Sequence, residues 1–233
     1  MRGLWASTIV FTAAMAAQSW AADRPVPRPV VVPVVAKPFT WTGHYAGLHC
    51  GVAWGRTVSA DNDDSVTVEP LGGLCGGQIG TNWQHDNVVF GLEADLGHFF
   101  LKGTEIVDAG GDDNEQFVAK VKYGPYATLT GRIGFAQGQS LLYLKGGAAF
   151  ARITNTWIEY EFGPPPSEFA ETTANRWGWA LGGGWEQAIN ATWSWKLEYL
   201  AMDFGRTITT SDGERLTHTN TVQTFKLGVN HRF

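Results

Sequence analysis

The chain has 233 residues, including 29 Gly and 11 Trp, with 17% charged residues and a net charge of −5. The acidic balance and the lack of a basic patch argue against a nucleic-acid-binding protein. High glycine with high tryptophan is unusual for a soluble core, because glycine contributes no packing. It is typical of strands that close around a narrow lumen and carry aromatic girdles outside.

The first 21 residues have the pattern of a secretory signal peptide. Arg2 precedes an apolar run from Leu4 to about Ala17, and the small residues Ser19 and Ala21 stand before a predicted cleavage site. The run is shorter than the roughly 20 residues that a membrane-spanning helix needs. We therefore predict that residues 1–21 are a signal peptide and that the protein is exported.

Residues 22–40 are predicted to form an extended linker rich in Pro and Val. Five of the ten prolines fall between Asp23 and Pro38. Proline fixes φ and removes a backbone donor, so a polyproline-like spacer is favoured. An arm that binds peptidoglycan or another partner is the alternative.

From Trp41 onward, eight segments alternate between apolar and polar residues, as β-strands with two unlike faces do. They are separated alternately by short and long connections. Short periplasmic turns and long external loops are the layout of an outer-membrane barrel. We therefore predict that residues 41–233 are an all-β, eight-stranded antiparallel transmembrane β-barrel. The predicted strands are 42–56, 72–84, 88–100, 123–136, 140–152, 176–188, 193–204 and 222–233, and the long loops are 57–71, 101–122, 153–175 and 205–221.

The last strand places apolar residues on one face and polar residues on the other. Such a regular strand would invite aggregation if its edge stayed open. We predict that it pairs with the strand beginning at Trp41 and forms the seam of the barrel. Its outward residues are predicted to be Phe225, Leu227, Val229 and Phe233.

The polar face of the strands is rich in glycine, and its charges balance. We therefore predict that this face lines the lumen and that the apolar face meets lipid. An eight-stranded barrel is just wide enough for its own side chains to fill, so an ion-paired plug is predicted; a gated or leaky ion path is the alternative. The predicted network consists of Glu93, Asp95, Arg132, Lys145, Glu186, Lys196, Glu198, Lys226 and Arg232.

Tryptophans recur near both ends of the predicted strands, as two interfacial belts require. The predicted girdle comprises Trp41, Trp54, Trp83, Trp179, Trp193 and Trp195.

Cys50 and Cys75 fall on the same face of adjacent predicted strands, roughly symmetrically about the first long loop. A cross-strand disulfide is compatible with export. Two small lipid-facing thiols are the alternative. Within the fourth predicted strand, Pro125 removes a ladder donor, so we expect a bulge or a late strand start there.

Several strand motifs resemble those of a known family. These motifs are WTGHYAGL at 41–48, VFGLEAD at 89–95, GRIGFA at 131–136 and GVNHRF at 228–233. They are similar to the small outer-membrane immunogenic proteins of Gram-negative bacteria, a porin-family, OmpA-like group of β-barrels. The resemblance implies an outer-membrane location and insertion guided by the C-terminal strand.

Outer-membrane lipid or lipopolysaccharide and the barrel-insertion machinery are the expected partners. Host or cell-envelope contacts are expected through the four long loops. No cofactor or metal site is predicted, because the acidic loops lack the ligand spacing of a Ca²⁺ site.

An enzyme is not predicted, although a hydrolase or acyltransferase in the outer membrane is an alternative. The chain contains neither Gly-x-Ser-x-Gly nor His-Glu-x-x-His, and Ser211 and His218 merely share a predicted loop. A soluble lipocalin-like ligand-binding barrel is the other alternative. It would turn the apolar face inward and the charged face to water.

Overall fold

The computed structural model describes residues 39–60, 65–108, 116–160, 168–211 and 214–233. The predicted signal peptide and residues 22–38 of the predicted linker lie outside the described residues. Within the described ranges, no helix is long and apolar enough to cross a membrane.

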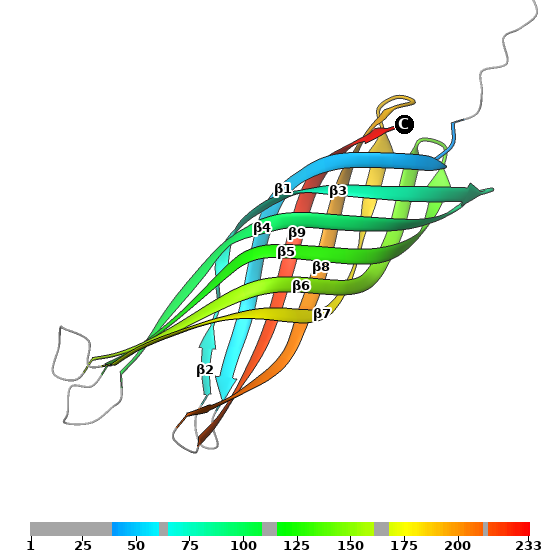
Figure 1. Ribbon diagram of the computed structural model, residues 1–233. Helices are drawn as coiled ribbons and strands as arrows, with labels where there is room; N and C mark the ends of the chain where they lie inside the picture. The colour runs from blue at the N-terminus through cyan, green and yellow to red at the C-terminus, as the bar shows by residue number, and fades with distance from the viewer. Residues whose placement is uncertain (1–38, 61–64, 109–115, 161–167, 212–213) are drawn as a thin grey trace, which may run out of the picture. The chain divides into compact units, whose positions relative to one another are not determined.

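Among the described residues, nine antiparallel strands form one sheet, which closes through the pairing of β1 with β9 (Figure 1). Eight of them are long and make the wall, as the alternating sequence predicts, and the first and last pair with each other. The seam therefore closes as predicted. The strands are β1 Gly43–Ala60, β2 Ser65–Val68, β3 Leu71–His85, β4 Val88–Asp108, β5 Gln116–Gln137, β6 Ser140–Tyr160, β7 Glu168–Ala188, β8 Trp193–Ser211 and β9 Glu214–Arg232.

The additional short strand, β2, lies within the first predicted long loop. It pairs with the end of β1, where Thr57 faces Val68. Val68 is buried and belongs to the apolar cluster inside the barrel. This segment therefore folds back onto the wall.

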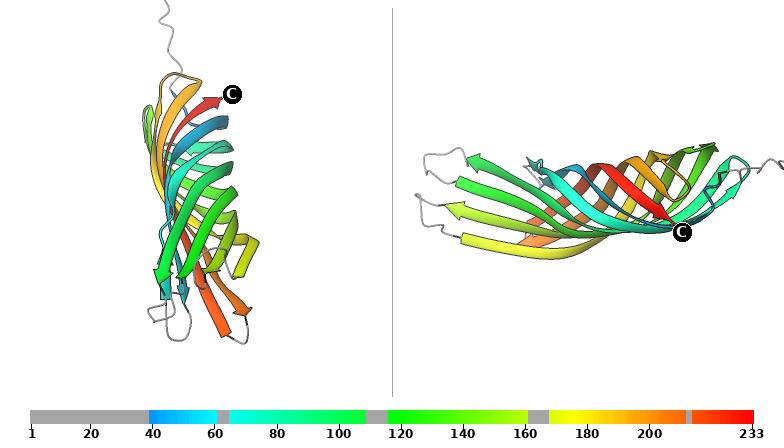
Figure 2. Two further views of the ribbon diagram at one scale, coloured as in Figure 1. Left: turned by 90° about the vertical axis from the view of Figure 1, so that its left-hand side faces the viewer. Right: turned by 90° about the horizontal axis from the view of Figure 1, so that it is seen from above.

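The long strands run well past their predicted ends on the side of the long connections (Figures 1 and 2). β4 ends at Asp108 rather than residue 100, and β5 begins at Gln116 rather than residue 123. Much of the four predicted loops is therefore strand. The extensions of β6, β7, β8 and β9 each contain at least two Thr, which favours strands, but they lack the regular alternation of apolar and polar residues on which the predicted strand ends were based.

The short turns lie where the sequence predicts them. β3 and β4 are joined at Asp86 and Asn87, and β5 and β6 at Gly138 and Gln139. Asp86 has φ 52° and Gly138 has φ 59°. These left-handed conformations suit Asp and Gly at tight hairpin turns.

The bulge expected near Pro125 is present. The β5–β6 register shifts between Tyr123 and Tyr126, and the β4–β5 register shifts between His98 and Lys102. Proline has no backbone N–H to donate to a neighbouring strand, so the pairing register shifts there.

The two faces of the wall differ in polarity as predicted. Leu48 and Leu96 point outward and are 74% and 70% exposed, whereas Lys196 and Glu198 point inward and are fully buried. The lipocalin-like alternative needs the opposite arrangement. An apolar outer surface around a polar interior is the pattern of a membrane barrel.

Candidate functional site

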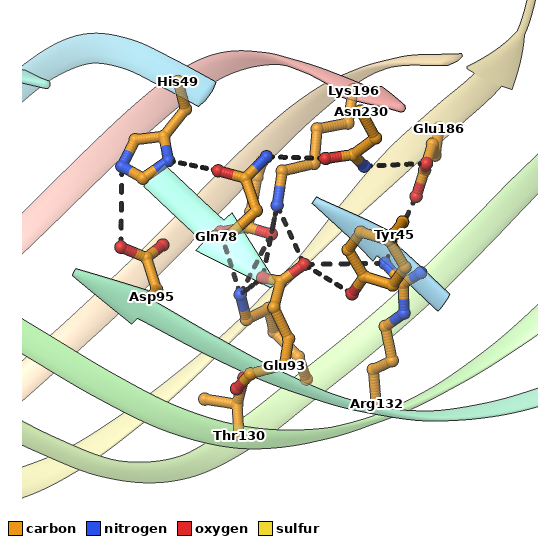
Figure 3. A network of polar contacts seen from close by, with 12 residues as sticks. Tyr45, His49, Gln78, Glu93, Asp95, Thr130, Arg132, Glu186, Lys196 and Asn230 are labelled. Atoms are coloured by element: carbon orange, nitrogen blue, oxygen red, sulfur yellow. Dashed lines mark hydrogen bonds and ion pairs between the residues drawn. The ribbon is translucent and has the colours of Figure 1, made fainter. Parts of the chain in front are cut away.

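The middle of the lumen is filled by charged side chains from six strands (Figure 3). Strand alternation puts every second residue on the inner face. Glu93 and Asp95 of β4 are therefore both inward, as are Lys196 and Glu198 of β8. The remaining charges come from β5, β6, β7 and β9.

Two carboxylates at the centre share their lysine partners. Lys145 Nζ is 2.5 Å from Glu93 Oε1 and 3.1 Å from Glu198 Oε1. Lys196 Nζ is 3.1 Å from Glu93 Oε2 and 3.4 Å from Glu198 Oε2. Each lysine thus bridges the same two acids, so loss of either acid removes a partner from both lysines.

Two further bases, Arg132 and Lys226, connect these central carboxylates to Glu186 and Asp95. Arg132 Nη1 is 3.2 Å from Glu186 Oε2 and 3.8 Å from Glu93 Oε2. Lys226 Nζ is 2.9 Å from Asp95 Oδ2 and 2.8 Å from Glu198 Oε1. The eight residues of the lumenal network are Glu93, Asp95, Glu186, Glu198, Arg132, Lys145, Lys196 and Lys226. Four acids meet four bases, and their formal charges cancel.

Arg232, the ninth predicted member, lies elsewhere. Its guanidinium donates to the backbone carbonyls of Thr40, Asn190 and Ala191 at 3.1–3.2 Å. It also stacks over the rings of Phe39 and Trp41, at 4.4 and 4.9 Å from their centroids. Arg232 lies at the end of β9 beside the β7–β8 turn, where its backbone N–H donates to Thr192 O at 2.7 Å. Its side chain therefore reaches the carbonyls of that turn instead of the mid-lumen carboxylates. Its assignment to the ion-pair network is wrong.

Neutral side chains add hydrogen bonds to the carboxylates of the lumenal network. The hydroxyl of Tyr45 donates to Glu93, and that of Tyr143 donates to Glu198, both at 2.8 Å. Ser194 and Asn230 donate to Glu186 at 2.6 and 2.9 Å. Sequence analysis did not single out these residues, although their inward register is the same as that of the charges.

His49 extends the polar lumen toward the loop end. Its Nδ1 lies 2.6 Å from Gln78 Oε1, its Nε2 lies 2.7 Å from the Tyr126 hydroxyl, and Nε2 is also 3.5 Å from Asp95 Oδ1. These contacts tie β1, β3, β4 and β5 together inside the wall.

Apolar clusters close the lumen on both sides of the lumenal network. Toward the short turns, the cluster contains Trp41, Val89, Ala136, Leu141, Tyr143 and Ala188. Toward the long connections, a larger cluster includes Val68, Leu74, Phe99, Leu101, Tyr123, Ile153, Leu200, Met202 and Phe204. Side chains therefore fill the lumen in three successive tiers.

Trp41 belongs to the inner cluster and not to the girdle, so that prediction is wrong. It is fully buried, and its Nε1 donates to Gly138 O at 3.2 Å. The residue precedes β1, which begins at Gly43, so strand alternation does not extend to it. The other predicted girdle residues lie on the outer face: Trp54, Trp83, Trp179 and Trp193 are exposed, and Trp195 is partly exposed.

Cys50 and Cys75 are direct partners in the β1–β3 register and are joined by a disulfide. Both are exposed on the outer face. The bond therefore fastens the first hairpin from the lipid side, next to the seam strand.

The closing strand presents its predicted insertion-signal residues outward. Phe225, Leu227, Val229 and Phe233 are between 43% and 74% exposed. Phe233 N donates to His44 O at 3.0 Å, so the last residue still pairs with the start of β1.

Carboxylate oxygens of Glu93, Asp95 and Glu198 lie within 4.8 Å of one another, as the ligands of a cation would. Lysine ammonium groups already contact all three acids. The positive charge that these acids need is therefore supplied by the chain itself.

Residues 6–233 match the family model described as "Outer membrane protein beta-barrel domain". The 31 kDa outer-membrane immunogenic protein of Brucella melitensis biotype 1 is 32% identical over 208 residues, covering 84% of this chain and 85% of that protein. The 25 kDa outer-membrane immunogenic protein of the same organism is 28% identical over 241 residues, covering 100% of each. Among solved structures, the outer membrane protein OprG of Pseudomonas aeruginosa matches with a TM-score of 0.49 and 12% identity, covering 84% of this chain and 98% of that one.

Proposed function

The chain belongs to the outer-membrane protein β-barrel family and is located in the bacterial outer membrane. We propose that it acts there as a closed structural barrel. Its extended hairpins serve surface interaction, and its lumen passes small solutes weakly at most.

The observation that carries the proposal is the filling of the lumen. All eight charged residues of the lumenal network are buried, and each is held by at least one opposite charge. An ion that enters must displace partners that are already paired in a low-dielectric interior. The apolar clusters on both sides of the network add two further barriers.

The surface-interaction part rests on the hairpins that extend beyond the apolar band. In β6 and β7, Thr154 is partly exposed and Thr173 is exposed, and their hydroxyls lie 3.0 Å apart. Thr156 likewise donates to Glu171 at 3.5 Å. Hydrated, hydrogen-bonded strand surface of this kind suits contacts with other cell-envelope or host molecules.

Enzymatic activity is not part of the proposal. The two Brucella relatives described above are named as immunogenic proteins, and neither hydrolase motif occurs in the chain. Lipase and protease assays on the folded protein test this point. Turnover that is lost in His218→Ala would overturn it.

Single-channel recording in planar bilayers tests the closed barrel. We expect the folded wild-type protein to give no steady conductance. A steady conductance that changes in Glu198→Gln, but not in a matched Asp203→Asn variant, would overturn the proposal in favour of a porin. Asp203 is a suitable control because it lies on the outward register of the same strand, β8.

A further inference from the structure

Three consecutive strands carry an exposed base on the outer face near the loop-end limit of the apolar band. These are Lys102 of β4, Lys122 of β5 and Arg152 of β6. On their own strands, Phe100 and Phe150 are the preceding outward residues. The bases therefore lie where the apolar surface gives way to water.

Two of these bases directly face each other. Lys102 and Lys122 are register partners in the β4–β5 pairing, and like charges directly opposite one another destabilise a sheet. Within the described part of the chain, the lysines that form ion pairs are Lys145, Lys196 and Lys226 in the lumen, not Lys102 or Lys122. Among the residues that the structure describes, neither Lys102 nor Lys122 has a salt-bridge partner that would offset the repulsion.

A surface hollow of about 460 Å³ lies at this pair, with Lys102 and Lys122 among its lining residues. It forms where residues 99–101 of β4 have no partner on β5, because of the register shift there. Leu71 and Phe100 also line it and are 69% and 58% exposed. Leu71 is the β3 register partner of Lys102, so apolar surface adjoins the cations directly.

We propose that this hollow binds the phosphate-bearing head of an outer-leaflet lipid, with an acyl chain lying against Leu71 and Phe100. Lysine ammonium groups bind phosphate oxygens through charge-assisted hydrogen bonds. An anion held between Lys102 and Lys122 removes their mutual repulsion, and the neighbouring apolar surface selects a lipid over a free anion. The inference rests on the proposed function, because it needs the long connections to face outward and this rim to lie in the outer leaflet.

Native mass spectrometry of the full folded protein in detergent tests the site. The probes are bisphosphorylated lipid A, the same lipid with both phosphates removed, and inorganic phosphate. We expect the phosphorylated lipid to bind, and Lys102→Gln/Lys122→Gln to weaken this binding by about tenfold or more. The matched control is Arg56→Gln/Arg206→Gln, which removes the same charge from exposed positions on β1 and β8.

Equal loss in both double variants, or equal binding of the dephosphorylated lipid, would overturn the proposal. Binding of inorganic phosphate with the same dependence on the two lysines would assign the site to a soluble anion and overturn the lipid. Heat-modifiable migration in gels verifies that each variant is folded. Conductance tests the proposed function separately. If the barrel conducts but still binds the lipid through the two lysines, only the closed barrel is refuted. If the barrel does not conduct and does not bind the lipid, only this site is refuted.

Discussion

Lys226 Nζ of the closing strand lies 2.9 Å from Asp95 Oδ2 of β4, although the two residues are 131 positions apart. The same nitrogen is 2.8 Å from Glu198 Oε1 on β8. The seam strand is thus held by backbone pairing at its edges and by ion pairs that cross the lumen. Closure of the wall and filling of the lumen therefore stabilise each other.

Replacement of Glu198 by Gln tests how much the lumenal network stabilises the fold. The change removes the charge that contacts Lys145, Lys196 and Lys226. Breaking a buried ion pair from one side costs about 3–5 kcal/mol, because the remaining charge stays buried. We expect a loss of this size in the free energy of unfolding, measured by urea titration in detergent. Asp203→Asn, at the outer rim, is the control, and an equal loss there would contradict a special role of the network.

Sequence alternation predicts most of the architecture because a membrane barrel imposes period 2 on both faces at once. The eight wall strands and the short turns follow from it. The seam between β1 and β9 follows from the need to close an open edge, and the bulge follows from the missing backbone donor of Pro125. The ends of the strands do not. Outside the bilayer the outward face no longer has to be apolar. The Thr-rich continuations of β8 and β9 therefore lose the alternation of apolar and polar residues, although their backbones remain paired.

The sequence predicts which residues of the candidate site face the lumen, but not how deep in the lumen each side chain lies. The inward register identifies Glu93, Lys196 and Lys226, but which charges meet depends on strand tilt and stagger across the barrel. Lys226 therefore meets Asp95, whereas Arg232, six residues further along the same strand, meets turn carbonyls. Local sequence contains no measure of that stagger.

Glycine at the seam is predicted to be required for close strand approach. A Cβ added to Gly51 would clash with Phe225 O of β9. Because that atom is backbone, Gly51→Ala forces the strands apart, and we expect a loss of about 1–3 kcal/mol in stability, as for other overpacked sites. Gly131→Ala is the control, since a Cβ there meets nothing within 4 Å. Urea midpoints of the two variants should therefore separate, and coincident midpoints would contradict the steric argument.

The disulfide is predicted to be protected from alkylation until it is reduced. A maleimide reagent should add no mass to the denatured, unreduced protein and should label both Cys50 and Cys75 after reduction. Cys50→Ala, which frees Cys75, is the positive control for labelling. Removal of both thiols in Cys50→Ala/Cys75→Ala should lower stability by about 2–4 kcal/mol. Free labelling of both thiols without reductant would refute the bond.

Trp41 is predicted to stabilise the barrel from within. It is fully buried and contacts Arg232 and Gly138. Trp41→Ala should therefore cost about 3–5 kcal/mol, the range for large aromatic truncations in a core. Trp83→Ala is the comparison, because Trp83 is 51% exposed on the outer face and its loss leaves no internal cavity. A greater loss of urea resistance in Trp83→Ala would place the more important tryptophan in the girdle.

Phe233 is predicted to act in assembly more than in the stability of the finished barrel. Its side chain is 74% exposed, and its backbone N–H pairs with His44, a contact that Phe233→Ser retains. We expect this variant to reach the outer membrane in much smaller amounts than wild type, while refolding into pure lipid vesicles with a similar yield. Phe135→Ser is the control, because Phe135 is also exposed on the outer face near the turn end, at 56%, and this variant should assemble at close to the wild-type level. If Phe233→Ser also refolds poorly in vesicles that contain no insertion machinery, the residue acts through the barrel itself and not as a recognition signal.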